Sequence, residues 1–182
     1  MSQFPGRRQA AGFSIIEMAA VVAVMAIMIA FAVPSFREFI VNYRASAQAN
    51  DLIADVAFAR GEAAKLGRTV QIVADGGGWG AGWIVGADLN NDTTISATEV
   101  MRQHGVIEEE FSLVEGSALT TIAFGAAGQL VTPAPPTTVQ FAICQPAGFN
   151  KHRAIVVNPV GRAEIRKWNG SDFGAGVTVT CS

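Results

Sequence analysis

Oxygen-bearing side chains recur between positions 88 and 99 with the spacing of a calcium-binding loop. Counted from position 88, they fall at loop positions 1, 3, 5, 7, 9 and 12, and the aliphatic Ile95 occupies loop position 8. Loop position 6 is normally a glycine, whereas this chain has Thr93 there. An Asx-rich turn between strands accounts for the same residues without a metal. Both interpretations stay open, and no other cofactor is expected; the candidate ligands are Asp88, Asn90, Asp92, Thr94, Ser96 and Glu99.

The two cysteines, Cys144 and Cys181, either form a disulfide or remain two unrelated buried thiols. Closing a loop of about 37 residues would stabilise the fold by about 3–4 kcal/mol in the chain-entropy model. A nucleophilic role is not expected, because His104 and His152 are the only candidate bases and no Asp or Asn completes a triad with either. The sequence offers no other convincing catalytic pair, so we do not predict an enzyme.

Basic residues gather between positions 150 and 168 of a chain that is acidic overall. Thirteen Lys and Arg stand against fifteen Asp and Glu, and this net charge of −2 argues against a general nucleic-acid binder. The basic cluster contains one acid, Glu164, and is followed by Trp168, which could stack on a base. Such a cluster can hold phosphates without reading a base sequence, or it can protect the edge strand of a sheet. Its members are Lys151, Arg153, Arg162, Arg166 and Lys167.

Glu17 precedes nineteen residues, 18–36, that carry no charge. A helix of that length crosses about 30 Å of hydrocarbon, and Arg7 and Arg8 on its N-terminal side place that end in the cytoplasm. The segment is a cleaved secretory signal, a plain membrane anchor, or a helix whose leader is cut off before it. A carboxylate in an apolar helix costs several kcal/mol without a partner. Only the third interpretation supplies one, the new terminal amine of a neighbouring copy.

Residues 11–17, Ala-Gly-Phe-Ser-Ile-Ile-Glu, resemble the processing site of type IV prepilins and pseudopilins. Pro34 also stands where such proteins usually have a proline, which kinks or locally breaks a helix. The resemblance implies that a prepilin peptidase and N-methyltransferase of the inner membrane cuts after Gly12 and methylates Phe13. We therefore divide the chain into a leader (1–12), a transmembrane and assembly helix (13–36) and a periplasmic body (37–182).

The body begins with a helix, because residues 35–66 contain no proline and only one glycine. Apolar residues recur there at spacings of three and four and form one stripe, and Gly67 is a plausible end of the helix. The predicted stripe is Leu52, Val56, Ala59, Ala63 and Leu66, and the predicted wet side carries Asp51, Asp55, Arg60, Glu62 and Lys65.

From position 68 onward the apolar period is two, which indicates short strands separated by Gly, Pro and Asn. The predicted fold class is α+β, with a long N-terminal, partly transmembrane helix packed on an antiparallel sheet. The glycine-rich run 76–82 lacks the Lys-Ser/Thr of a phosphate loop, so we interpret it as a mobile hairpin with an exposed Trp79. The predicted strands are 69–73, 82–85, 111–114, 119–124, 138–144, 154–157, 163–166 and 177–180.

Short motifs in the body extend the resemblance to minor pilins of the FimT/FimU type and to GspH-type pseudopilins; they are 60–67, 82–85, 88–92, 99–102 and 161–162. This resemblance implies a single-pass inner-membrane protein that joins a type IV pilus at or near its tip, with other pilin subunits as partners. The alternatives are a GspH-type pseudopilin of a type II secretion system and a FimT-like receptor for DNA uptake. Glu164 departs from the Gly-Arg-x-Arg motif of DNA-binding relatives. A periplasmic body would favour the disulfide.

Overall fold

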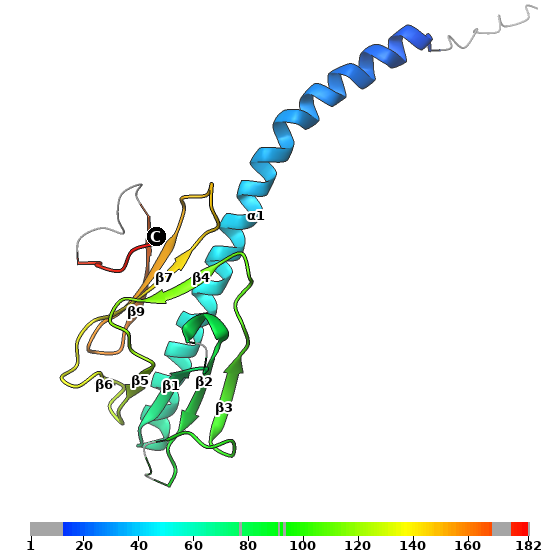
Figure 1. Ribbon diagram of the computed structural model, residues 1–182. Helices are drawn as coiled ribbons and strands as arrows, with labels where there is room; N and C mark the ends of the chain where they lie inside the picture. The colour runs from blue at the N-terminus through cyan, green and yellow to red at the C-terminus, as the bar shows by residue number, and fades with distance from the viewer. Residues whose placement is uncertain (1–12, 77, 91, 93, 169–175, 182) are drawn as a thin grey trace, which may run out of the picture. The chain divides into compact units, whose positions relative to one another are not determined.

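The computed structural model describes residues 13–76, 78–90, 92, 94–168 and 176–181. The chain divides into two compact units, Met1–Phe39 and Ile40–Ser182, and one helix, α1 (Ile15–Leu66), has residues in both (Figure 1). Nine strands follow α1 within the described residues, all of them in the second unit.

In the first unit, α1 exposes its apolar side chains. The large residues Met18, Ile27 and Phe31 are each more than half exposed. An 18-residue window of the helix has a mean hydropathy of 2.6, so by length and composition this helix can cross a membrane. Pro34 lies inside the helix, and α1 continues through it without a break.

In the second unit, one stripe of α1 is buried and the helix ends at a glycine. Gly67 adopts a φ of +63°, and the N–H of Arg68 donates to the carbonyl of Ala63 at 3.3 Å. A left-handed glycine just after the last turn is a common way to end a helix. The buried apolar residues follow the three-and-four spacing of one helix face: Val41, Ala45, Ala49, Leu52, Val56, Ala59 and Ala63.

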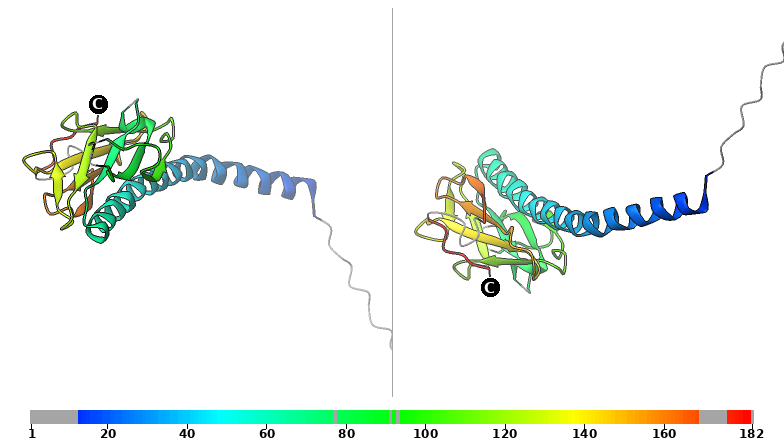
Figure 2. Two further views of the ribbon diagram at one scale, coloured as in Figure 1. Left: turned by 90° about the horizontal axis from the view of Figure 1, so that it is seen from below. Right: turned by 90° about the horizontal axis from the view of Figure 1, so that it is seen from above.

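Two antiparallel sheets lie on one side of this part of α1 (Figure 2). The five-stranded sheet has the order β3-β2-β1-β5-β6, and the four-stranded sheet has the order β4-β7-β8-β9. The first sheet consists of β1 (Val70–Ala74), β2 (Trp83–Ala87), β3 (Val100–His104), β5 (Thr121–Phe124) and β6 (Leu130–Thr132). The second consists of β4 (Ser112–Glu115), β7 (Val139–Cys144), β8 (Arg153–Val157) and β9 (Ala163–Lys167).

One apolar core joins the helix to both sheets. Leu52 of α1, Trp83 and Phe124 of the first sheet, and Phe141 and Ile155 of the second are at most 1% exposed. Burying each of these side chains contributes about 1.5–3 kcal/mol relative to exposure. The core therefore fixes the turns that connect the strands relative to the outer face of α1.

The α+β class is confirmed, but the strands are divided between two sheets rather than one, and two strands were not predicted. β3 carries the polar run Met-Arg-Gln-His and is mostly exposed at a sheet edge, so it has no apolar alternation. β6 has only three residues. Both lack the length or the pattern that period-two reasoning needs.

The predicted strand 177–180 is wrong, because this segment has no regular structure. Both edges of β7 are already occupied, by β4 and β8. The side chain of Gln140 holds the segment instead. Its amide nitrogen donates to the Gly176 carbonyl at 2.7 Å, and its oxygen accepts the N–H of Thr178 at 2.7 Å.

The expectation of an exposed Trp79 is also wrong. Trp79 begins a short 3-10 helix, η1 (Trp79–Ala81), and is 5% exposed. Its ring meets the ring of Phe141 edge to face at 4.7 Å, and its indole N–H donates to the carbonyl of Leu119 at 2.6 Å. The glycines around this tryptophan therefore let the chain fold an aromatic side chain inward.

Candidate functional site

Glu17 lies in the first turn of α1, and its side chain is exposed. With Ala20, Val21, Val24 and Met25 it lines a shallow, largely apolar hollow on the helix surface. No cation pairs with this carboxylate in the part of the chain that the structure describes. Pairing of this carboxylate with the terminal amine of a neighbouring copy stays a prediction.

The predicted processing site is only partly visible. Gly12 lies outside the described residues, whereas Phe13 is described and is 78% exposed. Pro34 leaves α1 intact but removes one backbone donor from it. Cleavage after Gly12 and methylation of Phe13 stay predictions.

The predicted disulfide is confirmed. Cys144, the last residue of β7, is bonded to Cys181, with 5.5 Å between their Cα atoms. Ala142, Ala154 and Val179 form a small apolar cluster around this bond. The disulfide and the Gln140 hydrogen bonds together attach the C-terminal segment to the four-stranded sheet.

The basic cluster does not form one continuous patch. Arg153 and Lys167 are directly opposite each other across β8 and β9, whereas Glu164 and Arg166 lie at the alternate positions of β9. The guanidinium of Arg166 binds the Glu164 carboxylate at 2.6 Å. Arg153 donates to the backbone carbonyl of His152 at 3.1 Å, and burial lowers the pKa of this arginine.

These contacts reduce the charge available to a phosphate backbone. Lys151, Arg162 and Lys167 remain exposed. Glu164, the residue that departs from the DNA-binding motif, also forms an ion pair with Arg166. The pairing of Arg166 with Glu164 weakens the DNA hypothesis, which stays a prediction.

The carboxylates of the predicted calcium loop hold the loop's own backbone. Asp92 accepts the hydroxyl and the N–H of Thr94 at 2.7 and 2.8 Å, and these bonds lower the pKa of Asp92. Glu99 is buried and accepts the hydroxyl and the N–H of Ser96 and the N–H of Leu89, which likewise lowers its pKa.

This is the arrangement of an Asx-rich turn. An oxygen of Asp88 also accepts the N–H of Asp92 at 3.1 Å. No group of three or more His, Cys, Asp or Glu among the described residues converges as a metal site does. The contacts favour the turn, and calcium stays a prediction.

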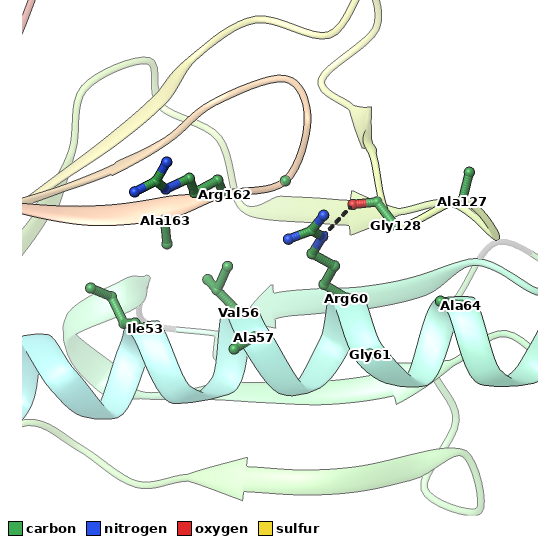
Figure 3. Close-up of a pocket in the computed structure, with 11 residues that line it drawn as sticks. Ile53, Val56, Ala57, Arg60, Gly61, Ala64, Ala127, Gly128, Arg162 and Ala163 are labelled. Atoms are coloured by element: carbon green, nitrogen blue, oxygen red, sulfur yellow. Dashed lines mark hydrogen bonds between the residues drawn. The ribbon is translucent and has the colours of Figure 1, made fainter.

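A groove that sequence reasoning missed runs beside the last turns of α1 (Figure 3). Its cavity volume is about 470 Å³. The small residues Ala57, Gly61 and Ala64 of α1 line one side, and the turns that contain Gly128 and Gly161 line the other. Arg60 and Arg162 also line it, so the walls are small or apolar and carry two positive charges. We call this site the Arg60 groove.

Glycines at both turns let Arg60 lie where it does. Its Nε donates to the carbonyl of Gly128 at 3.0 Å. A Cβ on Gly161, whose φ is +79°, would lie 2.3 Å from the Gly128 carbonyl oxygen and 3.3 Å from Cδ of Arg60. The signal in the sequence was a pair of glycines far apart along the chain, which no local pattern connects.

Comparison with known proteins identifies the fold family. The family model described as Type II transport protein GspH matches residues 48–161, well over half of the chain. The chain belongs to the GspH family. No curated protein sequence matches it.

Three solved structures are similar to this GspH-family chain. The type IV minor pilin FimU of Pseudomonas aeruginosa PAO1 has 27% identity over 69% of this chain and 92% of that one, with a TM-score of 0.57. A second crystal form of FimU gives a TM-score of 0.55. The minor pseudopilin EpsH of the Vibrio cholerae Type 2 Secretion System is 10% identical over 68% of this chain and 97% of that one, with a TM-score of 0.49.

The chain is therefore a minor pilin or pseudopilin of the GspH/FimU type, a family of structural subunits. The family match includes Arg60, Gly128 and Gly161 of the groove, but it does not extend to Glu17 or Cys181. The interpretations of Glu17 and of the C-terminal segment therefore depend on this chain's own residues, not on the family match.

Proposed function

We propose that this GspH-family chain is a minor pilin that joins a type IV pilus at or near its tip and supports pilus biogenesis. Its leader is removed after Gly12, its helix then sits once across the inner membrane, and its body faces the periplasm. The observation that carries the proposal is the exposed carboxylate of Glu17 at the start of an exposed apolar helix. The likeness to the minor pilin FimU supports a pilus over a secretion pseudopilus.

The chemistry of Glu17 explains why processing and assembly are coupled. A lone carboxylate in hydrocarbon costs several kcal/mol, and pairing with a cation offsets much of that cost. Cleavage after Gly12 creates an amine on Phe13, four residues from Glu17. In a bundle of parallel helices, the amine of one copy lies within reach of the Glu17 carboxylate of its neighbour. The partners are other pilin subunits and the prepilin peptidase.

The experiment compares the native chain with Glu17→Ala and with the matched control Glu62→Ala, which removes a carboxylate from the same helix within the body. Mass spectrometry of the membrane-extracted chain is expected to find Phe13 methylated at the N-terminus. Sheared filaments are expected to contain the native and Glu62→Ala chains and at least tenfold less of the Glu17→Ala chain. A chain that still begins at Met1, or equal incorporation of Glu17→Ala, contradicts the proposal.

DNA uptake is the weaker candidate, because Arg166 is engaged by Glu164. A pseudopilin role in type II secretion is the remaining alternative. The identity of the co-purifying filament subunits, pilin or pseudopilin, distinguishes it from the pilus.

A further inference from the structure

The Arg60 groove has the chemistry of a site for an acidic segment. The Nε of Arg60 is fixed by the Gly128 carbonyl, and its two terminal amino groups have no partner among the described residues. The Arg162 side chain, which lines the same groove, has no hydrogen-bond or ion-pair partner there either. One held guanidinium, that of Arg60, and a second cation, Arg162, beside small apolar walls suit a carboxylate carried on an apolar segment.

The same chain presents a segment of that kind elsewhere. The turn after β3, residues 105–111, which we call the acidic loop, contains three consecutive glutamates. Glu108 is bound to Arg44 of α1 at 3.2 Å, whereas Glu109 and Glu110 are exposed and have no ion-pair partner within the described residues. Val106 is 72% exposed and adds an apolar side chain to the loop.

The acidic loop and the Arg60 groove lie at opposite edges of the body. The loop follows β3, one edge of the five-stranded sheet, and the groove lies beside the turn that leads to β6, the other edge. On α1, Arg44 at the loop and Arg60 at the groove are sixteen residues apart. By helix geometry they are separated by about 24 Å along the axis and about 160° around it.

Two complementary surfaces on opposite sides of one molecule make a heterologous contact. Such a contact cannot close as a symmetric dimer, and its repetition generates a ring or an open helical filament. The axial offset requires that the second copy be displaced by about 24 Å along α1. Two bodies at the same level cannot make the contact, whereas staggered subunits of a helical filament can.

We propose that the Arg60 groove receives the acidic loop of a second copy of this chain in the assembled filament, with Glu109 and Glu110 against Arg60 and Arg162. This inference rests on the proposed function, since it needs a filament to hold the two copies in stagger. It requires that a filament contain at least two adjacent copies.

The test is site-directed cross-linking of the full chain in cells. Both native cysteines are consumed in a disulfide, so an added cysteine is the only free thiol. Chains with Ala64→Cys in the groove and differently tagged chains with Glu109→Cys are produced together and treated with a short bismaleimide. The matched control is Ala54→Cys, which is exposed on the same helix but does not line the groove.

The expected result is a two-tag product in sheared filaments from Ala64→Cys and not from Ala54→Cys, with at least tenfold less product in the membrane pool. Adding Arg162→Glu to the groove copy is expected to reduce the product at least tenfold, and Glu110→Arg on the loop copy is expected to restore it. Arg68→Glu, a charge reversal outside the groove, is expected to have no effect.

The outcomes separate the two proposals. If immunoblots detect the chain in filaments but no two-tag product forms, or the Ala64 thiol links to a different subunit, the second-copy contact is overturned and the proposed function stands. An equal yield from Ala54→Cys, or no response to Arg162→Glu, also overturns the contact. Absence of the chain from filaments overturns both.

Discussion

Asp55 shows how one buried charge connects the helix to a sheet edge. It is 7% exposed, and its carboxylate accepts the indole N–H of Trp83 at 2.8 Å and a guanidinium N–H of Arg102 at 3.2 Å. The guanidinium of Arg102 also lies 3.8 Å from the ring centre of Phe58. The sequence-based prediction that Asp55 lies on the solvent-exposed face of the helix is therefore wrong. Helical spacing gives the angle of a residue around the helix, but it cannot show that an edge strand covers that angle.

We expect Asp55→Ala to lower the free energy of unfolding by about 2–3 kcal/mol, because the buried Trp83 N–H loses its acceptor. The matched control is Asp51→Ala. Asp51 is 57% exposed in its side chain and lies 3.7 Å from His104, so its loss should cost less than about 1 kcal/mol. Denaturant unfolding of both variants, followed by tryptophan fluorescence, measures the difference. If the two variants lost equal free energy of unfolding, the buried hydrogen bonds of Asp55 would contribute no more than the exposed contact of Asp51.

His152 makes the body sensitive to mild acid. Its Nδ1 accepts the N–H of Gln145 at 3.0 Å, a role that only the neutral ring can fill. Burial lowers the pKa of His152, and the adjacent Arg153 cation lowers it further. The unfolded chain therefore takes up this proton at a higher pH than the folded chain does.

We expect the His152 contribution to be complete above about pH 7 and to decrease as the pH falls through about 6.5 toward the lower pKa of the folded state. His152→Asn keeps an acceptor but does not titrate, so its free energy of unfolding should change less between pH 7 and pH 5. If the free energy of unfolding changed equally with pH in the native chain and in His152→Asn, His152 would not be the source of the acid sensitivity. Denaturant titrations at several pH values provide the comparison.

At the scale of elements, the C-terminal segment depends on a covalent bond more than on a backbone ladder. It contains no regular strand in its described part, 176–181, and is attached through Gln140 and the Cys144–Cys181 bond. The sequence predicted the helix end and most strands because each has a local signature, and it predicted the disulfide because the chain has only two cysteines. It could not predict β3, β6 or the detachment of 177–180, because these depend on which sheet edges are already occupied.

Reduction of the disulfide is expected to lower the free energy of unfolding by about 4 kcal/mol in the chain-entropy model, since the bonded residues are 37 positions apart. Denaturant unfolding with and without dithiothreitol measures the loss. The control is the Cys144→Ala, Cys181→Ala double variant, which should be weakened already and should not respond to dithiothreitol. A native chain that is equally stable in both conditions would contradict the prediction.

At the scale of the whole molecule, the two units differ in burial: within the described residues, only the second has an apolar core. Every residue of the main apolar core lies between Val41 and Ile165, in the second unit, whereas the described part of the first unit has only exposed side chains up to Phe39. From charge and hydropathy the sequence predicts an apolar helix at 13–36 and a body at 37–182. It could not predict the Arg60 groove, because its walls come from one helix and two turns that only the assembled core brings together.

A chain that begins at Arg37 is therefore expected to fold without detergent and to remain monomeric at low concentration. It loses the exposed apolar residues up to Phe36 but none of the main core. Its free energy of unfolding should lie within about 1 kcal/mol of that of the full chain in detergent, because the removed residues contribute no burial to that core. Circular dichroism and size-exclusion chromatography check folding and association.

As a control, a chain that begins at Leu52 lacks Val41, Ala45 and Ala49 of the core and should unfold or aggregate. If the chain from Arg37 behaved in the same way, the first unit would be part of the folding unit rather than only its anchor.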